Sequence, residues 1–76
     1  MQAERAVLGG LLLDSSYFNV VKDKLCTSDF AHKEHRSIYH VMRQLWDEHK
    51  SFEAGLVSLR LQPLEKYIFE MANETV

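Results

Sequence analysis

Apolar residues recur at spacings of three and four along this chain, and no segment shows sustained alternation of apolar and polar residues. The strongest run ends at His49, and Ile38, Val41, Met42 and Leu45 share one face of it. That period is typical of an amphipathic α-helix, whereas a half-buried strand repeats every second residue. The pattern therefore predicts an all-α fold, a small orthogonal helical bundle of about five helices.

Shorter helices are expected before and after this long one. They cover residues 3–13, 17–25, 56–61 and about 63–73. Asp14, Ser15 and Ser16 have the side-chain oxygens that cap a helix N-terminus, so they predict the break between the first two helices. Pro63 suits the first position of the last helix, where its missing N–H is harmless.

The length of the chain limits how much stability its own core can supply. Seventy-six residues form one small domain, residues 1–76. A core of that size usually supplies only about 3–5 kcal/mol, so disulfides, metals or association often add support. Cys26 is the only cysteine, which excludes an internal disulfide and is more typical of a small core residue. We expect a reducing, cytoplasmic setting, with no signal peptide and no membrane span.

The charge balance argues against direct binding of nucleic acid by this chain. Nine Lys and Arg residues are outnumbered by eleven Asp and Glu residues, for a net charge of −2. Proteins that bind duplexes usually gain their non-specific affinity from clustered cations. The densest basic group here, over residues 22–36, is interleaved with carboxylates.

Nothing in the sequence forms a catalytic, cofactor or metal motif. None of the three glycines precedes the Lys-Ser or Lys-Thr pair of a phosphate-binding loop. His32 and His35 are three residues apart, and Lys33 occupies the place that Glu takes in a metalloprotease helix. These histidines are therefore interpreted as surface or helix-start residues. The sequence predicts a domain that is not an enzyme and needs no cofactor.

Two features point to packing against another helix or another protein. Gly9 and Gly10 each destabilise a helix by about 1 kcal/mol relative to Ala, so we expect them to allow a close approach of another backbone. Tyr39, Met42 and Trp46 form a second stripe beside the apolar face of the long helix, and Arg43 joins Tyr39 and Trp46 as a candidate protein-binding residue. Either that helix is touched on two sides within the bundle, or the stripe lies on a rim and binds a partner.

Five segments occur in an order that resembles the N-terminal domain of DnaB-type replicative DNA helicases. They are residues 3–14, the apolar positions of 18–25, Asp29-Phe30, residues 35–39 with Leu45, and residues 67–75. The chain departs from that family's pattern in two places. Residues 51–53 stand where the family usually has Pro-Ile-Asp. Residues 63–66 stand where the family tends to have a longer link that contains a Gly-Gly pair.

The resemblance implies a non-catalytic, all-helical collar domain on a hexameric helicase ring. In that family the domain packs as a trimer of dimers and binds the DnaG-type primase of the primosome, and a helicase loader is a further partner. ATP, Mg and single-stranded DNA belong to a RecA-like ATPase domain of the parent protein. We expect this chain to lack that domain and the helical hairpin that completes the N-terminal domain. It should then dimerise poorly or be monomeric.

Two other function classes stay open from the residues alone. The chain could be a different helical interaction module, such as a helicase loader fragment or the helicase-binding domain of a primase. It could also be a weak helix-turn-helix binder of nucleic acid. Binding to a purified primase domain separates the first alternative from the helicase collar, and the salt dependence of binding separates the second.

Overall fold

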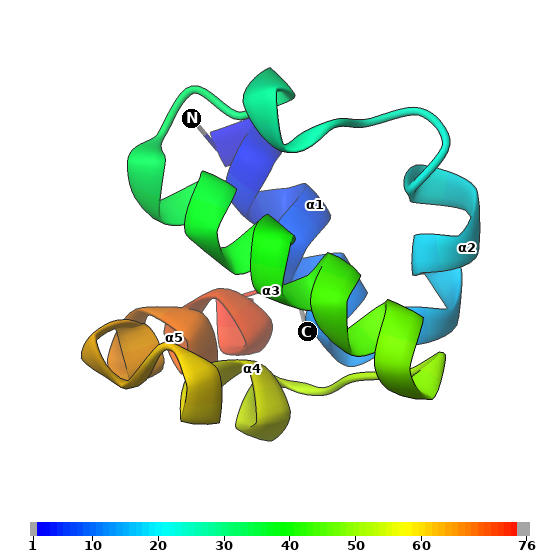
Figure 1. Cartoon of the computed structure of the whole chain (residues 1–76). Coiled ribbons are helices and arrows are strands. Elements are labelled where there is room, and N and C mark those ends of the chain that lie inside the picture. The colour runs from blue at the N-terminus through cyan, green and yellow to red at the C-terminus, as the bar shows by residue number, and fades with distance from the viewer. Residues whose placement is uncertain (1, 75–76) are drawn as a thin grey trace.

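Every regular element of the structure is helical. The computed structural model describes residues 2–74, and none of these residues lies in a strand (Figure 1). The α-helices are α1 (Gln2–Leu13), α2 (Phe18–Val21), α3 (Lys33–His49), α4 (Ala54–Arg60) and α5 (Glu65–Glu74). Three single-turn 3₁₀ helices lie between them, η1 (Ser15–Tyr17), η2 (Thr27–Asp29) and η3 (Gln62–Leu64). The predicted all-α bundle of five helices is confirmed.

The long helix α3 organises the bundle. It packs against α1 and α4, and α5 packs against α1 and α4, so the four helices enclose one core. In Figure 1, α3 crosses in front of α1, α4 and α5 lie below these two helices, and α2 lies at the right of the view. α3 ends at His49, and the next residue, Lys50, adopts a left-handed conformation (φ 56°) and donates its N–H to the Trp46 carbonyl.

The break between α1 and α2 forms as the sequence predicts. Asp14 follows the last residue of α1, and its Oδ1 accepts from the backbone N–H of Ser16 at 3.2 Å and from the Ser16 hydroxyl at 2.6 Å. The cap opens the 3₁₀ turn η1 rather than an α-helix. Pro63 likewise lies in the 3₁₀ turn η3 that precedes α5, and not in the α-helix itself.

The second helix is shorter than predicted, and side chains of α3 bind the carbonyl groups just beyond its end. α2 ends at Val21, where residues 17–25 were expected to be helical. The Tyr39 hydroxyl donates to the Leu25 carbonyl at 2.8 Å, and Arg43 donates to the carbonyls of Lys22 and Leu25, each at 3.2 Å. These bonds satisfy backbone acceptors beyond the end of α2, which would lack an intrahelical partner even in a helix that ended at Leu25.

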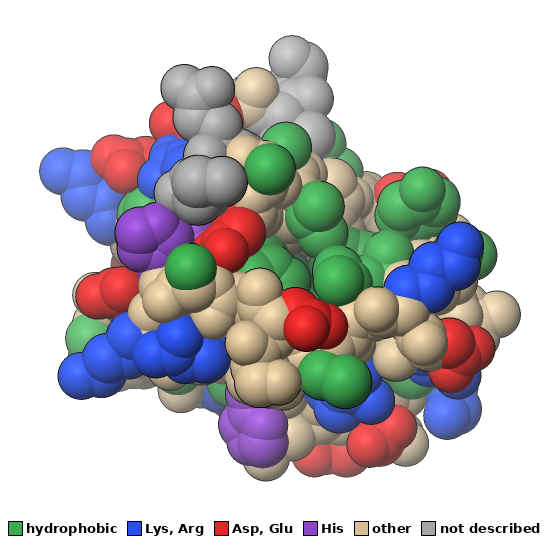
Figure 2. Space-filling model, turned by 90° about the horizontal axis from the view of Figure 1, so that it is seen from above, with side chains coloured by type: hydrophobic (Ala, Val, Ile, Leu, Met, Phe, Trp, Pro, Cys, Tyr) green, Lys and Arg blue, Asp and Glu red, His purple; other side chains and the backbone are tan. Residues whose placement is uncertain are grey.

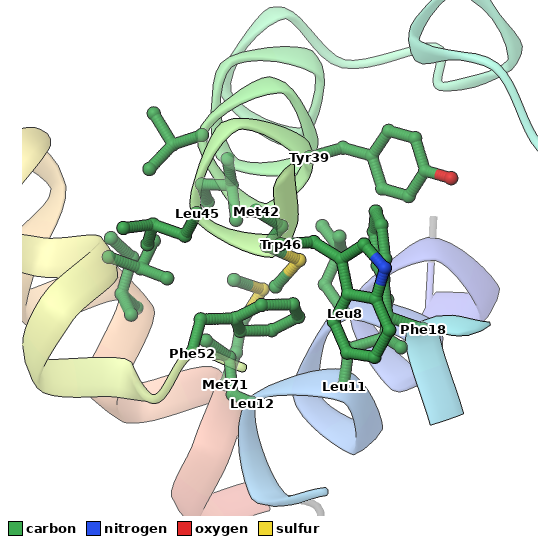
Figure 3. Packing of buried hydrophobic residues seen from close by; sticks show 14 of the residues in the cluster. Leu8, Leu11, Leu12, Phe18, Tyr39, Met42, Leu45, Trp46, Phe52 and Met71 are labelled. Atoms are coloured by element: carbon green, nitrogen blue, oxygen red, sulfur yellow. The ribbon is translucent and has the colours of Figure 1, made fainter. Parts of the chain in front are cut away.

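Phe18 lies at the centre of an aromatic cluster in the core (Figure 3). Its ring centroid lies 5.5 Å from those of Tyr39, Trp46 and Phe52. Such tilted and edge-on contacts add to the free energy gained by burying the rings. Phe52 belongs to the segment that departs from the helicase pattern, so that departure contributes a buried side chain to the core.

Candidate protein-interaction surface

Two of the three residues singled out on α3, Tyr39 and Trp46, lie in the core. Tyr39 is fully buried, and Trp46 exposes only 9% of its surface. Burial raises the pKa of the Tyr39 hydroxyl, against the opposing effect of its hydrogen bond with Arg43. The hypothesis that Tyr39 and Trp46 lie on an exposed rim is therefore corrected, because their rings pack against Phe18 and leave no free face for a partner.

Arg43 also makes its contacts within the chain. Its guanidinium donates to two carbonyls beyond α2 and lies 5.6 Å from the centre of the Tyr39 ring. The residue is half-buried, and this arrangement anchors the end of α2 to α3. A role of Arg43 in binding a partner stays a prediction.

The two glycines of α1 differ in their surroundings. Gly9 is buried, and close packing there stays a prediction. A Cβ atom added at Gly10 would meet nothing within 4 Å beyond the neighbouring backbone of its own helix. The expected close approach of another backbone is therefore wrong for Gly10 within the described residues. Instead Gly10 lines an open groove together with Val7 and Val20.

His35 lies in the first turn of α3, as the helix-start interpretation allowed, but it is buried and not on the surface. It exposes 1% of its surface and connects three helices. Its Nδ1 lies 2.7 Å from Oε1 of Glu4 on α1, and its Nε2 lies 2.5 Å from the hydroxyl of Tyr67 on α5. A carboxylate can only accept, so Nδ1 of His35 donates to Glu4. No three- and four-residue period could have revealed this link.

Glu4 is the acceptor at the centre of that polar network. Its Oε2 accepts from the backbone N–H of Ala31 at 2.8 Å while Oε1 accepts from His35. The Ala31 bond and then the His35 bond lower the pKa of Glu4 from 4.5 to about 2. Arg36 completes the connection by donating to the carbonyls of Phe30 and Ala31 at 2.9 and 3.0 Å. The polar residues of this region therefore hold helices together.

Arg5, near the start of α1, forms an ion pair with Glu74 at the end of α5. Its guanidinium lies 2.6 Å from Oε1 of Glu74 and 4.8 Å from the centre of the Tyr67 ring. Both contacts join α1 to α5, the pair of helices that begins and ends the bundle.

No catalytic arrangement emerges from the described residues. Residues 2–74 hold no group of three or more His, Cys, Asp or Glu side chains that could bind a metal ion. Cys26 is exposed, which corrects its interpretation as a small core residue. No helix within the described part of the chain is long and apolar enough to cross a membrane.

Comparison with known proteins identifies the family of this chain. Residues 1–76 match the family described as DnaB-like helicase N terminal domain. The chain belongs to this family. The match covers every residue, so the resemblance seen in the sequence motifs is confirmed.

Curated relatives carry the name replicative DNA helicase DnaB. The protein of Buchnera aphidicola subsp. Schizaphis graminum is 43% identical over 47 residues, which are 62% of this chain and 10% of that protein. The protein of Buchnera aphidicola subsp. Baizongia pistaciae is 30% identical over 59 residues, 78% of this chain and 12% of that protein. The chain thus spans about a tenth of the length of these relatives. No solved structure matches it significantly.

Proposed function

We propose that this DnaB-like domain is a non-catalytic collar of a replicative DNA helicase, which helps to assemble the hexameric ring and binds a DnaG-type primase. The family match over residues 1–76 carries the proposal. It favours the helicase over a loader fragment or a primase domain, because the relatives named above are themselves replicative helicases.

The chemistry of unwinding is then located outside this chain. ATP, Mg and single-stranded DNA would be bound by a RecA-like domain of the parent protein. The residues of this chain instead supply shape and contacts. Their polar network of Glu4, His35 and Tyr67 joins α1, α3 and α5, and it would keep a docking surface rigid while the ring works. A helicase loader is a second candidate partner. The domain would act in the cytoplasm, as part of replication.

The proposal is tested by measuring the mass of the chain by light scattering, alone and mixed with the C-terminal domain of a DnaG-type primase. A stoichiometric complex supports primase binding. A mixture in which both proteins keep their separate masses at micromolar concentration contradicts it. The mass of the chain alone reports self-association, and a monomer is expected.

A further inference from the structure

A groove between α1 and α2 exposes apolar side chains. It has a volume of about 520 Å³. Its lining includes Val7, Gly10, Tyr17, Val20, Lys24 and Leu25. Tyr17 exposes 61% of its surface and Val20 exposes 48%. In Figure 2, hydrophobic side chains gather around a hollow on the face seen from above, with basic and acidic side chains at its margins. We call this surface the α1–α2 groove.

The groove continues toward the start of α3. A smaller depression of about 150 Å³ shares Val7 and Leu25 with it and reaches Phe30. Because they share these two side chains, the two depressions lie next to each other along α1, and together we call them the trough. A trough of this shape fits a helix that lays one apolar ridge into it, as in helix-in-groove recognition.

Gly10 keeps the floor of the trough open. Gly destabilises a helix interior by about 1 kcal/mol relative to Ala, and nothing in the bundle would clash with a Cβ atom at this position. Packing inside the described chain therefore does not explain Gly10. A large side chain that enters the trough from outside would contact the bare backbone of α1 here.

The charges at the margins define the polar side of the occupant. Lys24 lines the groove and is exposed, and no carboxylate among residues 2–74 forms an ion pair with it. The carboxylates at the far end are already engaged, since Glu4 accepts from Ala31 and Asp29 accepts from the backbone of Cys26 at 2.7 Å. An occupant that carries a carboxylate at the Lys24 end is therefore attracted most strongly to the groove.

We infer that the α1–α2 groove binds an amphipathic helix of another protein, with large apolar side chains against Gly10 and Val20 and a carboxylate against Lys24. A second copy of this chain fits less well, because a two-fold pair would set the same concave surface against itself and leave a void. The inference deepens the proposed interaction function and rests on it. It does not require the partner to be the primase.

The test uses nuclear magnetic resonance titrations of the chain with a synthetic stapled helical peptide. The peptide has Leu and Phe on one face and a single Glu at one end of that face. We expect it to shift the amide signals of the groove residues. Val20→Glu should weaken binding of the peptide by about tenfold or more, because the substitution places a charge in the apolar contact. Leu59→Glu is the matched control, since Leu59 on α4 is 65% exposed and does not line the groove.

A charge exchange tests the orientation of the helix. Lys24→Glu should weaken binding of the original peptide several-fold. A second peptide, in which Lys replaces Glu, should bind this variant with restored affinity. A peptide that binds the Val20→Glu and Leu59→Glu variants equally well, or does not bind the unchanged chain, overturns the inference. Light scattering that shows a dimer broken by Val20→Glu, without peptide binding, assigns the groove to a second copy and also overturns it.

The primase domain is titrated in parallel, so the two proposals can fail separately. If the peptide binds in the groove and the primase domain does not bind, primase recognition is contradicted and the groove assignment stands. If the primase domain binds while the peptide does not, the groove assignment falls and the proposed function stands.

Discussion

Nδ1 of His35 lies 2.7 Å from Oε1 of Glu4, and this hydrogen bond joins α3 to α1 in an otherwise apolar interior. The side chains expose 2% and 16% of their surfaces. Because Tyr67 of α5 holds the other ring nitrogen, one imidazole fixes the relative positions of three helices. Breaking a buried polar contact of this kind lowers the stability of the fold, because each partner left behind has neither a hydrogen bond nor access to water.

His35→Ala should therefore lower the free energy of unfolding by about 2–4 kcal/mol, from the cavity and the unsatisfied Glu4 and Tyr67 groups together. Urea denaturation followed by circular dichroism measures the change. His40→Ala on the exposed side of the same helix is the control and should alter stability by less than about 0.5 kcal/mol. Equal effects of the two substitutions would contradict the role assigned to His35.

The contribution of Glu4 should disappear in acid. Its pKa is about 2 in the folded chain, below the ordinary value of 4.5, so the folded state binds the proton less readily than the unfolded state. The resulting stabilisation is fully present above the ordinary pKa and is lost as the pH falls toward about 2.

The comparison of the native chain with Glu4→Gln isolates this effect. The native chain should be the more stable of the two at neutral pH, and the gap should narrow steadily between pH values of about 4.5 and 2. Urea titrations at several pH values in that window measure it. A gap that does not change with pH would show that Glu4 keeps its ordinary pKa.

Gly10→Ala should raise the free energy of unfolding by about 1 kcal/mol, because the helix gains propensity and the added Cβ atom meets nothing within 4 Å. Thermal unfolding measures the gain. Gly55→Ala serves as a comparison, since a Cβ atom there would lie 3.4 Å from Oε1 of Glu53 near the start of α4. Destabilisation by Gly10→Ala would restore the close packing first expected at this position.

Trp46→Ala should lower the free energy of unfolding by about 3–5 kcal/mol, as expected for truncation of a buried aromatic side chain. The indole packs against Phe18 on α2, so its loss leaves a cavity between α2 and α3. Gln44→Ala, an exposed neighbour on α3, is the control for helix propensity. A stable Trp46→Ala variant that loses only partner affinity would return Trp46 to the role of a docking anchor.

The helical fold was predictable because its signal is local. The apolar spacing from Ile38 to His49 predicts a helix, and the structure places that run inside α3. The capping oxygens of Asp14 mark a helix break in the same local way. The contacts of the segment after α2 were not predictable, because its Leu25 and Lys22 carbonyls accept from Tyr39 and Arg43, about fourteen or more residues further along the chain.

The assignment of surface and core on α3 was only half predictable. Periodicity shows that Tyr39 and Trp46 share a stripe, but it does not show what lies opposite that stripe. Phe18 comes from a separate short helix and covers both rings, which turns a candidate docking face into core. Exposed apolar side chains lie instead on α1, η1 and α2, among them Val7, Tyr17 and Val20, as well as on α4 and α5.

The sequence by itself determined the all-helical class, the main helix breaks and, through its motifs, the family. Each of these depends on residues close together in the chain or on their order. Only the tertiary structure decided that His35 is a buried link, that Trp46 belongs to the core and that Gly10 opens a groove. Those properties depend on which side chains meet across helices that are distant in sequence. Packing sets these contacts, and no local pattern encodes them.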